Sequence, residues 1–361
     1  MRSLMKAAVL AFALTLSPAV SGQSVRLLVG TYTEGTSAEG IYLCAFDPET
    51  AGIRPLSVVS VGNPSFVITS PDGKEVYAVN EYGDGRQGIS AFARVGDSLI
   101  PTARLTIPES SVDGADPCNL LYTGDALVSS NYSGGSVTSF ALDGSGVPRA
   151  LTQSFAAEHA HMHCAVLSPD GRYIFVADLG RDCIHRFERG AGGRPLGAQT
   201  LAWSNPDPVR KGPRHLIFSA DGRFAYLLCE LSDHLLVFSY ADGVLTPIQT
   251  LRAYSGKGHG SADLHLSPDG RFLYTSHRLK KDGVAIFKVN AKTGKVRKAG
   301  FQPTGTHPRN FALSPDGRFL LCACRDDNRI EIYRRDEASG RLRSTGQSLE
   351  LGAPVCIQFL P

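Results

Sequence analysis

Short segments in which hydrophobic and polar residues alternate recur along most of the chain. Examples are GISAFAR (88–94), HLLVFSY (234–240), GVAIFKV (283–289) and RIEIYRR (329–335). Strict alternation places every second side chain on one face, which is typical of a half-buried β-strand. No helical period of useful length appears, so the pattern predicts an all-β protein.

A turn motif repeats between these segments. The tetrapeptide S-P-D-G occurs at 70–73, 168–171, 267–270 and 314–317, with S-A-D-G at 219–222 and a degenerate Y-T-G-D at 122–125. Proline fixes φ, aspartate bonds its own backbone and glycine tolerates positive φ, so turn geometry alone explains the motif and its aspartates need no catalytic role. Each turn joins two apolar strands, and a third strand and a more polar fourth segment follow. This unit is one four-stranded antiparallel blade of a β-propeller.

Seven such units can be counted. First strands are expected at 65–69, 118–122, 163–167, 214–218, 262–266, 309–313 and 355–359. The last of these has no turn or partner after it, whereas the N-terminal part supplies an unpaired strand at 25–29 and a third-type strand at 40–46. Joining the two ends in one blade leaves no open sheet edge. We therefore predict one seven-bladed propeller domain over residues 23–361, closed by the N- and C-terminal strands.

The first 22 residues differ from the rest of the chain. Arg2 and Lys6 precede an apolar run at 7–16, and Ser17, Pro18 and several small residues follow it. This is the pattern of a secretory signal peptide, and the apolar run is about half of the roughly 20 residues that a membrane span needs. We predict that residues 1–22 are a signal peptide and that the mature protein is periplasmic or secreted, without a membrane anchor.

Composition narrows the partners and cofactors. The net charge of +3 is small for 361 residues, and no basic patch indicates nucleic-acid binding. The eight cysteines lie mostly inside apolar strand patterns, which favours buried single thiols over disulfides; Cys322 and Cys324 form a CxC pair, but no second pair completes a zinc site. We expect a monomer with no metal and no other cofactor.

The two rims of such a propeller have different chemistry. The turns occupy one rim, while the starts of the first strands and the ends of the second strands meet at the other, around the mouth of the central channel. Ionisable residues gathered there predict a polar pocket for a small ligand. Strand starts contribute His161, His163, Arg214, His215, Arg309 and Asn310, and strand ends contribute Glu81, Asn131, Asp178, Glu230, His277, Arg278 and Arg325.

Each of these residues, taken singly, is also compatible with a solvated rim position. As a set, the cations that face the channel indicate an anionic or carbonyl ligand. The sixteen residues from Arg214 to Glu230 are the out-and-back length of one hairpin, so these two side chains should be neighbours.

The chain resembles the propeller-type 6-phosphogluconolactonase family, which is similar in turn to the fungal carboxy-muconate lactonising enzymes. The resemblance lies in NPSFVITSPDGKEVYAVNE (63–81), HMHCAVLSPDGRYIFVADLG (161–180), GPRHLIFSADGRFAYLLCEL (212–231) and HPRNFALSPDGRFLL (307–321). It covers essentially all of the predicted mature chain, and its P-R-H and S-H-R elements are more specific than the turns. Where family members often have Asn-Gln, this chain has Cys324-Arg325, an extra arginine that bears on the identity of the substrate.

The resemblance implies a metal-independent site that hydrolyses a sugar lactone, of the 6-phosphogluconolactone type, in carbohydrate metabolism. Matching motifs place His163, Arg214, Glu230 and Arg278 at the positions of functional residues. The other rim residues are candidates for substrate binding: His161, His215, Arg309, Asn310, Arg325 and Glu81.

Lactone opening needs an activated water and a stabiliser for the carbonyl oxygen. Glu230 and His163 are both candidates for the general base. His163 is favoured because its ordinary pKa lies near neutral pH, whereas Glu230 beside Arg214 should stay ionised and orient that arginine. Arg214 and Arg278 would bind the phosphate or carboxylate of the substrate, and one of them would stabilise the oxyanion.

Three alternatives use the same scaffold. A muconate-type lactonising cycloisomerase would run related chemistry in the reverse sense. A non-enzymatic propeller would bind a protein or another ligand, since the fold hosts many functions. A metal-dependent lactonase would need a converging set of oxygen ligands, for which Glu81, Asn131 and Asp178 are the candidates.

Overall fold

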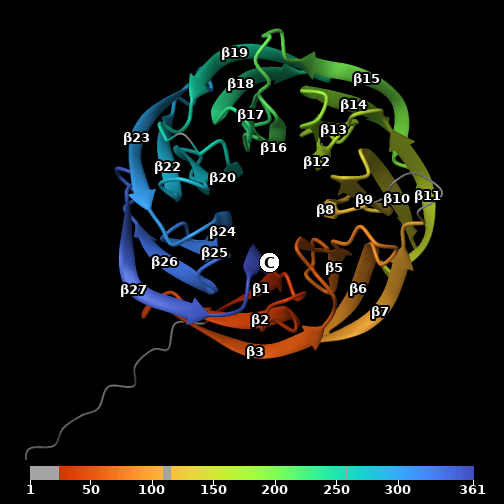
Figure 1. The fold of residues 1–361 in the computed structure, drawn as a ribbon, viewed down its shortest axis with the longest axis horizontal. Coiled ribbons are helices and arrows are strands. Elements are labelled where there is room, and N and C mark those ends of the chain that lie inside the picture. Colours follow the sequence, from red (N-terminus) through yellow and green to blue (C-terminus); the bar gives the residue numbers. More distant parts are fainter. Residues whose placement is uncertain (1–23, 109–114, 257) are drawn as a thin grey trace, which may run out of the picture.

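The computed structural model describes residues 24–108, 115–256 and 258–361. These residues form seven four-stranded antiparallel sheets arranged as blades around one axis (Figure 1). The predicted all-β, seven-bladed propeller is confirmed. No helix occurs in the described ranges, and hence none there is long and apolar enough to cross a membrane. The predicted signal peptide at 1–22 lies outside the described residues.

Each blade runs outward from the axis in four layers of strands. The innermost strands are β28 (Pro354–Phe359), β4 (Val67–Thr69), β8 (Pro117–Tyr122), β12 (Met162–Leu167), β16 (Pro213–Phe218), β20 (Ser261–Leu266) and β24 (Pro308–Leu313). The second are β1 (Val25–Thr31), β5 (Glu75–Asn80), β9 (Ala126–Asn131), β13 (Tyr173–Asp178), β17 (Phe224–Cys229), β21 (Phe272–His277) and β25 (Phe319–Cys324). The third are β2 (Gly40–Asp47), β6 (Gly88–Val95), β10 (Ser136–Leu142), β14 (Cys183–Arg189), β18 (His234–Ala241), β22 (Gly283–Val289) and β26 (Arg329–Arg335). The outermost are β3 (Gly52–Ser60), β7 (Ser98–Thr106), β11 (Pro148–Ala156), β15 (Leu196–Ser204), β19 (Val244–Arg252), β23 (Val296–Pro303) and β27 (Leu342–Glu350).

The two ends of the chain close the ring within one blade. The C-terminal strand β28 is the innermost strand of that blade and pairs antiparallel with β1, with Leu27 opposite Phe359 and Val29 opposite Ile357. Strands β1, β2 and β3 supply the other three layers, as Figure 1 shows. The predicted closure is confirmed.

The hydrophobic core lies between the blades. The described residues contain seven hydrophobic clusters, and each joins two neighbouring blades. Second-layer strands such as β17 and β25 are buried along their whole length because both faces contact neighbouring blades. Packing between sheets therefore holds the blades in place and carries the innermost strands to the axis.

The S-P-D-G turns have the geometry expected from their residues. In all four, and in the S-A-D-G turn, the serine hydroxyl donates to the aspartate carboxylate over 2.5–2.7 Å. The glycines have φ between 64° and 70°, a conformation that glycine adopts at little cost. Asp170 and Asp269 also accept from Tyr240 and Arg335 of a neighbouring blade, so the turn aspartates have a structural role.

Candidate active site

The innermost strands depart from regular pairing where they begin, at the rim opposite the turns. In β8, β12, β16 and β24 the register with the second-layer strand skips one residue. The skipped residues are Cys118, His163, Arg214 and Arg309. Such a β-bulge re-aims the extra side chain, and bulges are common next to active sites. Four blades thus present a different chemical group at the same structural position.

Glu230 joins two arginines from neighbouring blades. Its two carboxylate oxygens accept from Arg214 Nε over 2.8 Å and from Arg278 Nη2 over 2.7 Å. The arginine side chains are only 2% and 5% exposed. Burial alone would raise the pKa of Glu230, but Arg214, Arg278 and Arg309 hold it below its ordinary value. The expected Arg214–Glu230 contact is confirmed, and the cluster is an ionised arginine–glutamate–arginine group.

His163 is buried beside this group. Its ring meets the rings of His215 and Tyr132 edge-on, and its Nδ1 lies 3.9 Å from Cys118 Sγ. Burial, then the positive charge of Arg214, lowers the pKa of His163 well below its ordinary value, so the ring is neutral at neutral pH. The sequence argument placed this pKa near neutrality because it used the unperturbed value. Among the described residues, His163 Nε2 has no hydrogen-bond partner.

Arg309 and Glu81 form a second, looser pair. Arg309 Nη2 lies 3.7 Å from Glu81 Oε1, and its guanidinium lies over the ring of Tyr32. The Tyr32 hydroxyl donates to Glu81 over 2.8 Å, and Ser65 donates to the other carboxylate oxygen. Within the described ranges the Arg309 guanidinium makes no hydrogen bond, although its side chain is only 17% exposed. Its N–H groups are therefore free to bind a ligand.

His215 and Asn310 meet at Asp263, in contacts that connect neighbouring innermost strands. His215 Nδ1 lies 2.8 Å from Asp263 Oδ1, and Asn310 Nδ2 donates to Asp263 Oδ2 over 2.6 Å. Asn310 Oδ1 accepts from the backbone N–H of Ile357 on β28. Most hydrogen-bonding atoms of His215 and Asn310, which were predicted to bind substrate, are therefore engaged by other residues of the protein.

Arg278 contacts a further residue that the sequence argument did not single out. His307 Nε2 lies 3.1 Å from Arg278 Nη1, and His307 Nδ1 lies 3.2 Å from Asp326 Oδ2. Asp326 also accepts a hydrogen bond from Arg325 Nε over 2.6 Å. Arg325, which was predicted to bind substrate, thus forms an ion pair with its neighbour on the rim. His307 opens the H-P-R-N element two residues before Arg309, so the motif contained the signal.

The remaining rim candidates are satisfied by local contacts. His161 stacks on Tyr132, with ring centroids 4.6 Å apart, and its backbone N–H donates to Asp178. Asn131 bonds Ser136 and Thr138 within its own blade, and both ring nitrogens of His277 lie against hydroxyl groups. Glu81, Asn131 and Asp178, the candidates for a metal-dependent lactonase, thus each have side-chain partners of their own.

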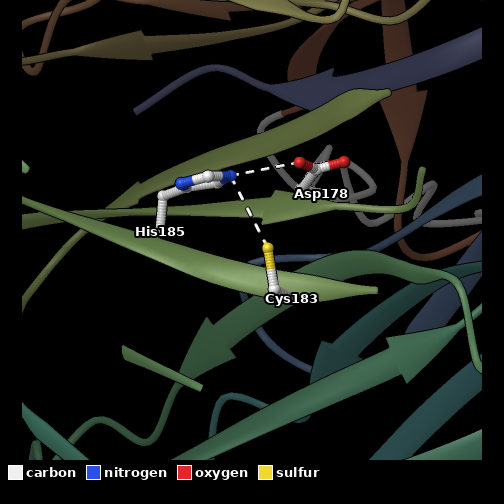
Figure 2. Close-up of side chains that lie close together, drawn as sticks. All are labelled: Asp178, Cys183 and His185. Atoms are coloured by element: carbon white, nitrogen blue, oxygen red, sulfur yellow. Dashed lines mark hydrogen bonds and ion pairs between the residues drawn. The ribbon is translucent and has the colours of Figure 1, made fainter. Parts of the chain in front are cut away.

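A different group has the composition of a metal site. Asp178, Cys183 and His185 are fully buried and bring three potential ligand atoms together, as Figure 2 shows. His185 Nε2 lies 3.1 Å from Asp178 Oδ2 and 3.6 Å from Cys183 Sγ, while Nδ1 contacts the side-chain amide of Gln199. Both ring nitrogens therefore have protein partners, and the histidine–aspartate pair is satisfied as a structural contact.

The cysteines follow the sequence prediction. All eight are buried free thiols. Cys322 and Cys324 lie on β25 with their sulfur atoms 4.0 Å apart. Burial raises the pKa of Cys118, whose sulfur contacts His163 Nδ1, so this thiol is protonated and unreactive as a nucleophile.

A family model described as a seven-bladed β-propeller lactonase matches residues 26–359. A 6-phosphogluconolactonase of Formosa agariphila is 33% identical, over 92% of this chain and 99% of its own. A 6-phosphogluconolactonase of Bacillus subtilis is 29% identical, over 92% of this chain and 97% of its own.

Solved structures give the same picture. A candidate 6-phosphogluconolactonase of Bacteroides uniformis is 42% identical, with a TM-score of 0.88 over 93% of this chain and 99% of its own. The periplasmic gluconolactonase PpgL of Pseudomonas aeruginosa is 33% identical, with a TM-score of 0.86 over 94% of this chain and 99% of its own.

Proposed function

Because the chain belongs to the lactonase family of seven-bladed β-propellers, we propose that it hydrolyses a sugar lactone at the bulge-bearing rim. Membership confirms the resemblance inferred from the motifs and makes the chain a lactonase, a hydrolase of cyclic esters. The observation that carries the proposed site is the arrangement of two groups with free polar atoms, His163 Nε2 and the Arg309 guanidinium, beside the ionised Arg214–Glu230–Arg278 cluster.

His163 acts as the general base. Its lowered pKa keeps the ring neutral, and its Nε2 accepts a proton from water as the water oxygen attacks the lactone carbonyl carbon. The tetrahedral intermediate then breaks the bond between that carbon and the ring oxygen. His163 returns the proton to the departing ring oxygen, so lactone and water give a hydroxy acid with no net change at the protein.

Arg309 stabilises the carbonyl oxygen as it becomes anionic. A positioned donor in a buried site is effective at this task because little solvent reorganises around it. Three of the five N–H groups of Arg214 already donate to Glu230, His215 and a backbone carbonyl, and the remaining two on Nη2 face the substrate. Arg278 likewise supplies its uncommitted N–H groups, and the two arginines bind the hydroxyl or anionic groups of the sugar.

The substrate is a sugar lactone of the 6-phosphogluconolactone type or its unphosphorylated counterpart. Relatives named 6-phosphogluconolactonase favour the first, and the relative named periplasmic gluconolactonase favours the second. The signal-like N-terminal pattern and this periplasmic relative together support export of the chain. An exported enzyme meets few phosphorylated metabolites, so export of the chain favours an unphosphorylated lactone as its substrate.

The test is a hydrolysis screen of the purified mature protein on phosphorylated and plain aldonolactones, with a muconate-type lactone as a third substrate class. Hydrolysis of an aldonolactone is expected, and it should survive treatment with EDTA. His163→Ala, Arg214→Ala and Glu230→Gln should each lower kcat/KM at least about tenfold in protein whose circular dichroism is unchanged. Three active variants, or a protein active only on the muconate lactone, would exclude the proposal.

A further inference from the structure

Two series of side chains, each linked by hydrogen bonds or ion pairs, meet at Glu230. On the β16 side, the Asp263 carboxylate lies 2.8 Å from His215 Nδ1, and His215 Nε2 lies 3.2 Å from Arg214 Nη1. Arg214 then donates through Nε to Glu230. The order is therefore carboxylate, imidazole, guanidinium and finally the shared carboxylate.

The second series repeats this order with other residues. The Asp326 carboxylate lies 3.2 Å from His307 Nδ1, and His307 Nε2 lies 3.1 Å from Arg278 Nη1. Arg278 donates through Nη2 to the second oxygen of Glu230. His215 lies within the innermost strand β16, whereas His307 precedes β24, and Asp263 lies within β20, whereas Asp326 follows β25. The two series therefore use different positions of the blade, and their likeness does not follow from the blade repeat.

The chemistry of the partners assigns the protons. A guanidinium only donates, so the Nε2 atom that faces it carries a lone pair. A carboxylate only accepts, so the Nδ1 atom that faces it carries the hydrogen. Both histidines are thus neutral Nδ1–H tautomers, in the arrangement by which a carboxylate commonly orients a functional imidazole. Burial, then the nearby arginines, lowers the pKa of both, that of His307 to about 3.

We propose that His215 and His307 are positioning residues that hold Arg214 and Arg278 in the direction needed to bind the substrate. This rests on the proposed lactone hydrolysis. Glu230 accepts from one nitrogen of each arginine, and a backbone carbonyl accepts from another N–H, that of Ala262 from Arg214 and that of Gly260 from Arg278. The histidine adds the contact at Nη1, which fixes the direction of the N–H groups that remain for the substrate. The carboxylates Asp263 and Asp326 select the tautomer that makes this possible. Neither histidine touches the reacting atoms.

A matched pair of substitutions separates positioning from packing. In His307→Gln the amide oxygen takes the place of Nε2 as an acceptor for Arg278, whereas His307→Leu keeps a similar volume without an acceptor. We expect His307→Leu to lower kcat/KM on the preferred lactone at least about tenfold, and His307→Gln to restore it to within about threefold of wild type. The pair His215→Gln and His215→Leu should behave alike.

His234→Leu is the control, because among the described residues its ring forms a hydrogen bond only with the backbone carbonyl of Ser232. It should stay within about twofold of wild type. Equal losses in the Gln and Leu variants, or a His307→Leu enzyme that keeps more than half of its kcat/KM, would overturn the positioning role.

A measurement that does not use activity tests the same idea. Two-bond 1H–15N correlation spectra of histidine-labelled wild-type protein at pH 7, assigned with the Gln variants, should show His215 and His307 as neutral Nδ1–H tautomers. Nε2–H tautomers or charged rings would overturn the proposal, whatever the lactone assay gives. If no lactone is hydrolysed while both tautomers are as expected, the proposed function fails and the two arginine–histidine contacts stand.

Discussion

The two rims of the propeller are made by the same hairpins, but one rim repeats the same residues from blade to blade and the other carries a different residue in each blade. At the turn rim, five turns repeat one serine–aspartate hydrogen bond and one left-handed glycine. At the other rim, the bulge position holds Cys118, His163, Arg214 and Arg309 in four blades. The serine–aspartate hydrogen bond lies within each turn, so the same residues recur. The bulged residues find partners in other blades, so each contributes a different group to one shared site.

The largest effect is expected from removing the residue that joins the blades at the site. Glu230→Ala leaves the buried cations Arg214 and Arg278 without their carboxylate. Breaking a buried ion pair in this way typically costs about 3–5 kcal/mol. Urea unfolding followed by fluorescence should show a fall of that order in the free energy of unfolding, along with loss of hydrolysis. A stability within about 1 kcal/mol of wild type would mean that the contact is not needed to hold the rim.

Arg309 should matter for the chemical step more than for stability, because its guanidinium makes no hydrogen bond within the described ranges. Arg309→Met is expected to lower kcat by about 10²–10³, the usual cost of losing one oxyanion donor. Steady-state kinetics measures this, with Arg172→Met at the turn rim as the matched control. Arg172 pairs with Asp170 and Asp242 on the surface, and its loss should leave kcat unchanged. Equal effects of the two substitutions would contradict the distinction between the rims.

The pH dependence tests the neutral state of His163. Burial and Arg214 lower its pKa well below 6.5, so the ring keeps its neutral form as the pH falls through the ordinary range of a histidine. The profile of kcat/KM should show no loss of activity from protonation of a group with an ordinary histidine pKa. In the unfolded chain His163 titrates normally and binds more protons below pH 6.5, so this residue contributes less to stability as the pH falls. A fall in kcat/KM with an apparent pKa near 6.5, which disappears when His163 is replaced, would contradict the assignment.

The smallest effect is expected at the turn rim. Asp221 accepts from Ser219 and from the backbone of its own turn, and it also pairs with exposed Arg223. Asp221→Asn keeps an acceptor there, so thermal and urea unfolding should change by no more than about 1 kcal/mol and hydrolysis should not change. A large loss of activity would show that the turns are coupled to the site.

Sequence reasoning located the candidate site by topology and missed some of its contacts. Arg214 and Glu230 were recognised as neighbours because one hairpin connects them, and this separation is a property of the chain. His307 lies 29 residues from Arg278 in a different blade, and its Nε2 contact depends on how the two blades pack. Tyr32, which bonds Glu81, is separated from it by 49 residues and was missed for the same reason.

The sequence by itself determined the repeat, the number of blades and the turns, because each depends on residue type and spacing within about fifty residues. It also indicated the closure of the ring, because counting the units leaves an unpaired strand at each end of the propeller. It further determined which residues lie near the rim opposite the turns. Only the tertiary structure decided how those residues pair, since the bulges that redirect His163 and Arg309 and the contacts that join Glu230 to two arginines arise between strands and between blades. The ordinary pKa of a histidine is a property of the residue, but its lowering at His163 comes from burial and from charges on other blades.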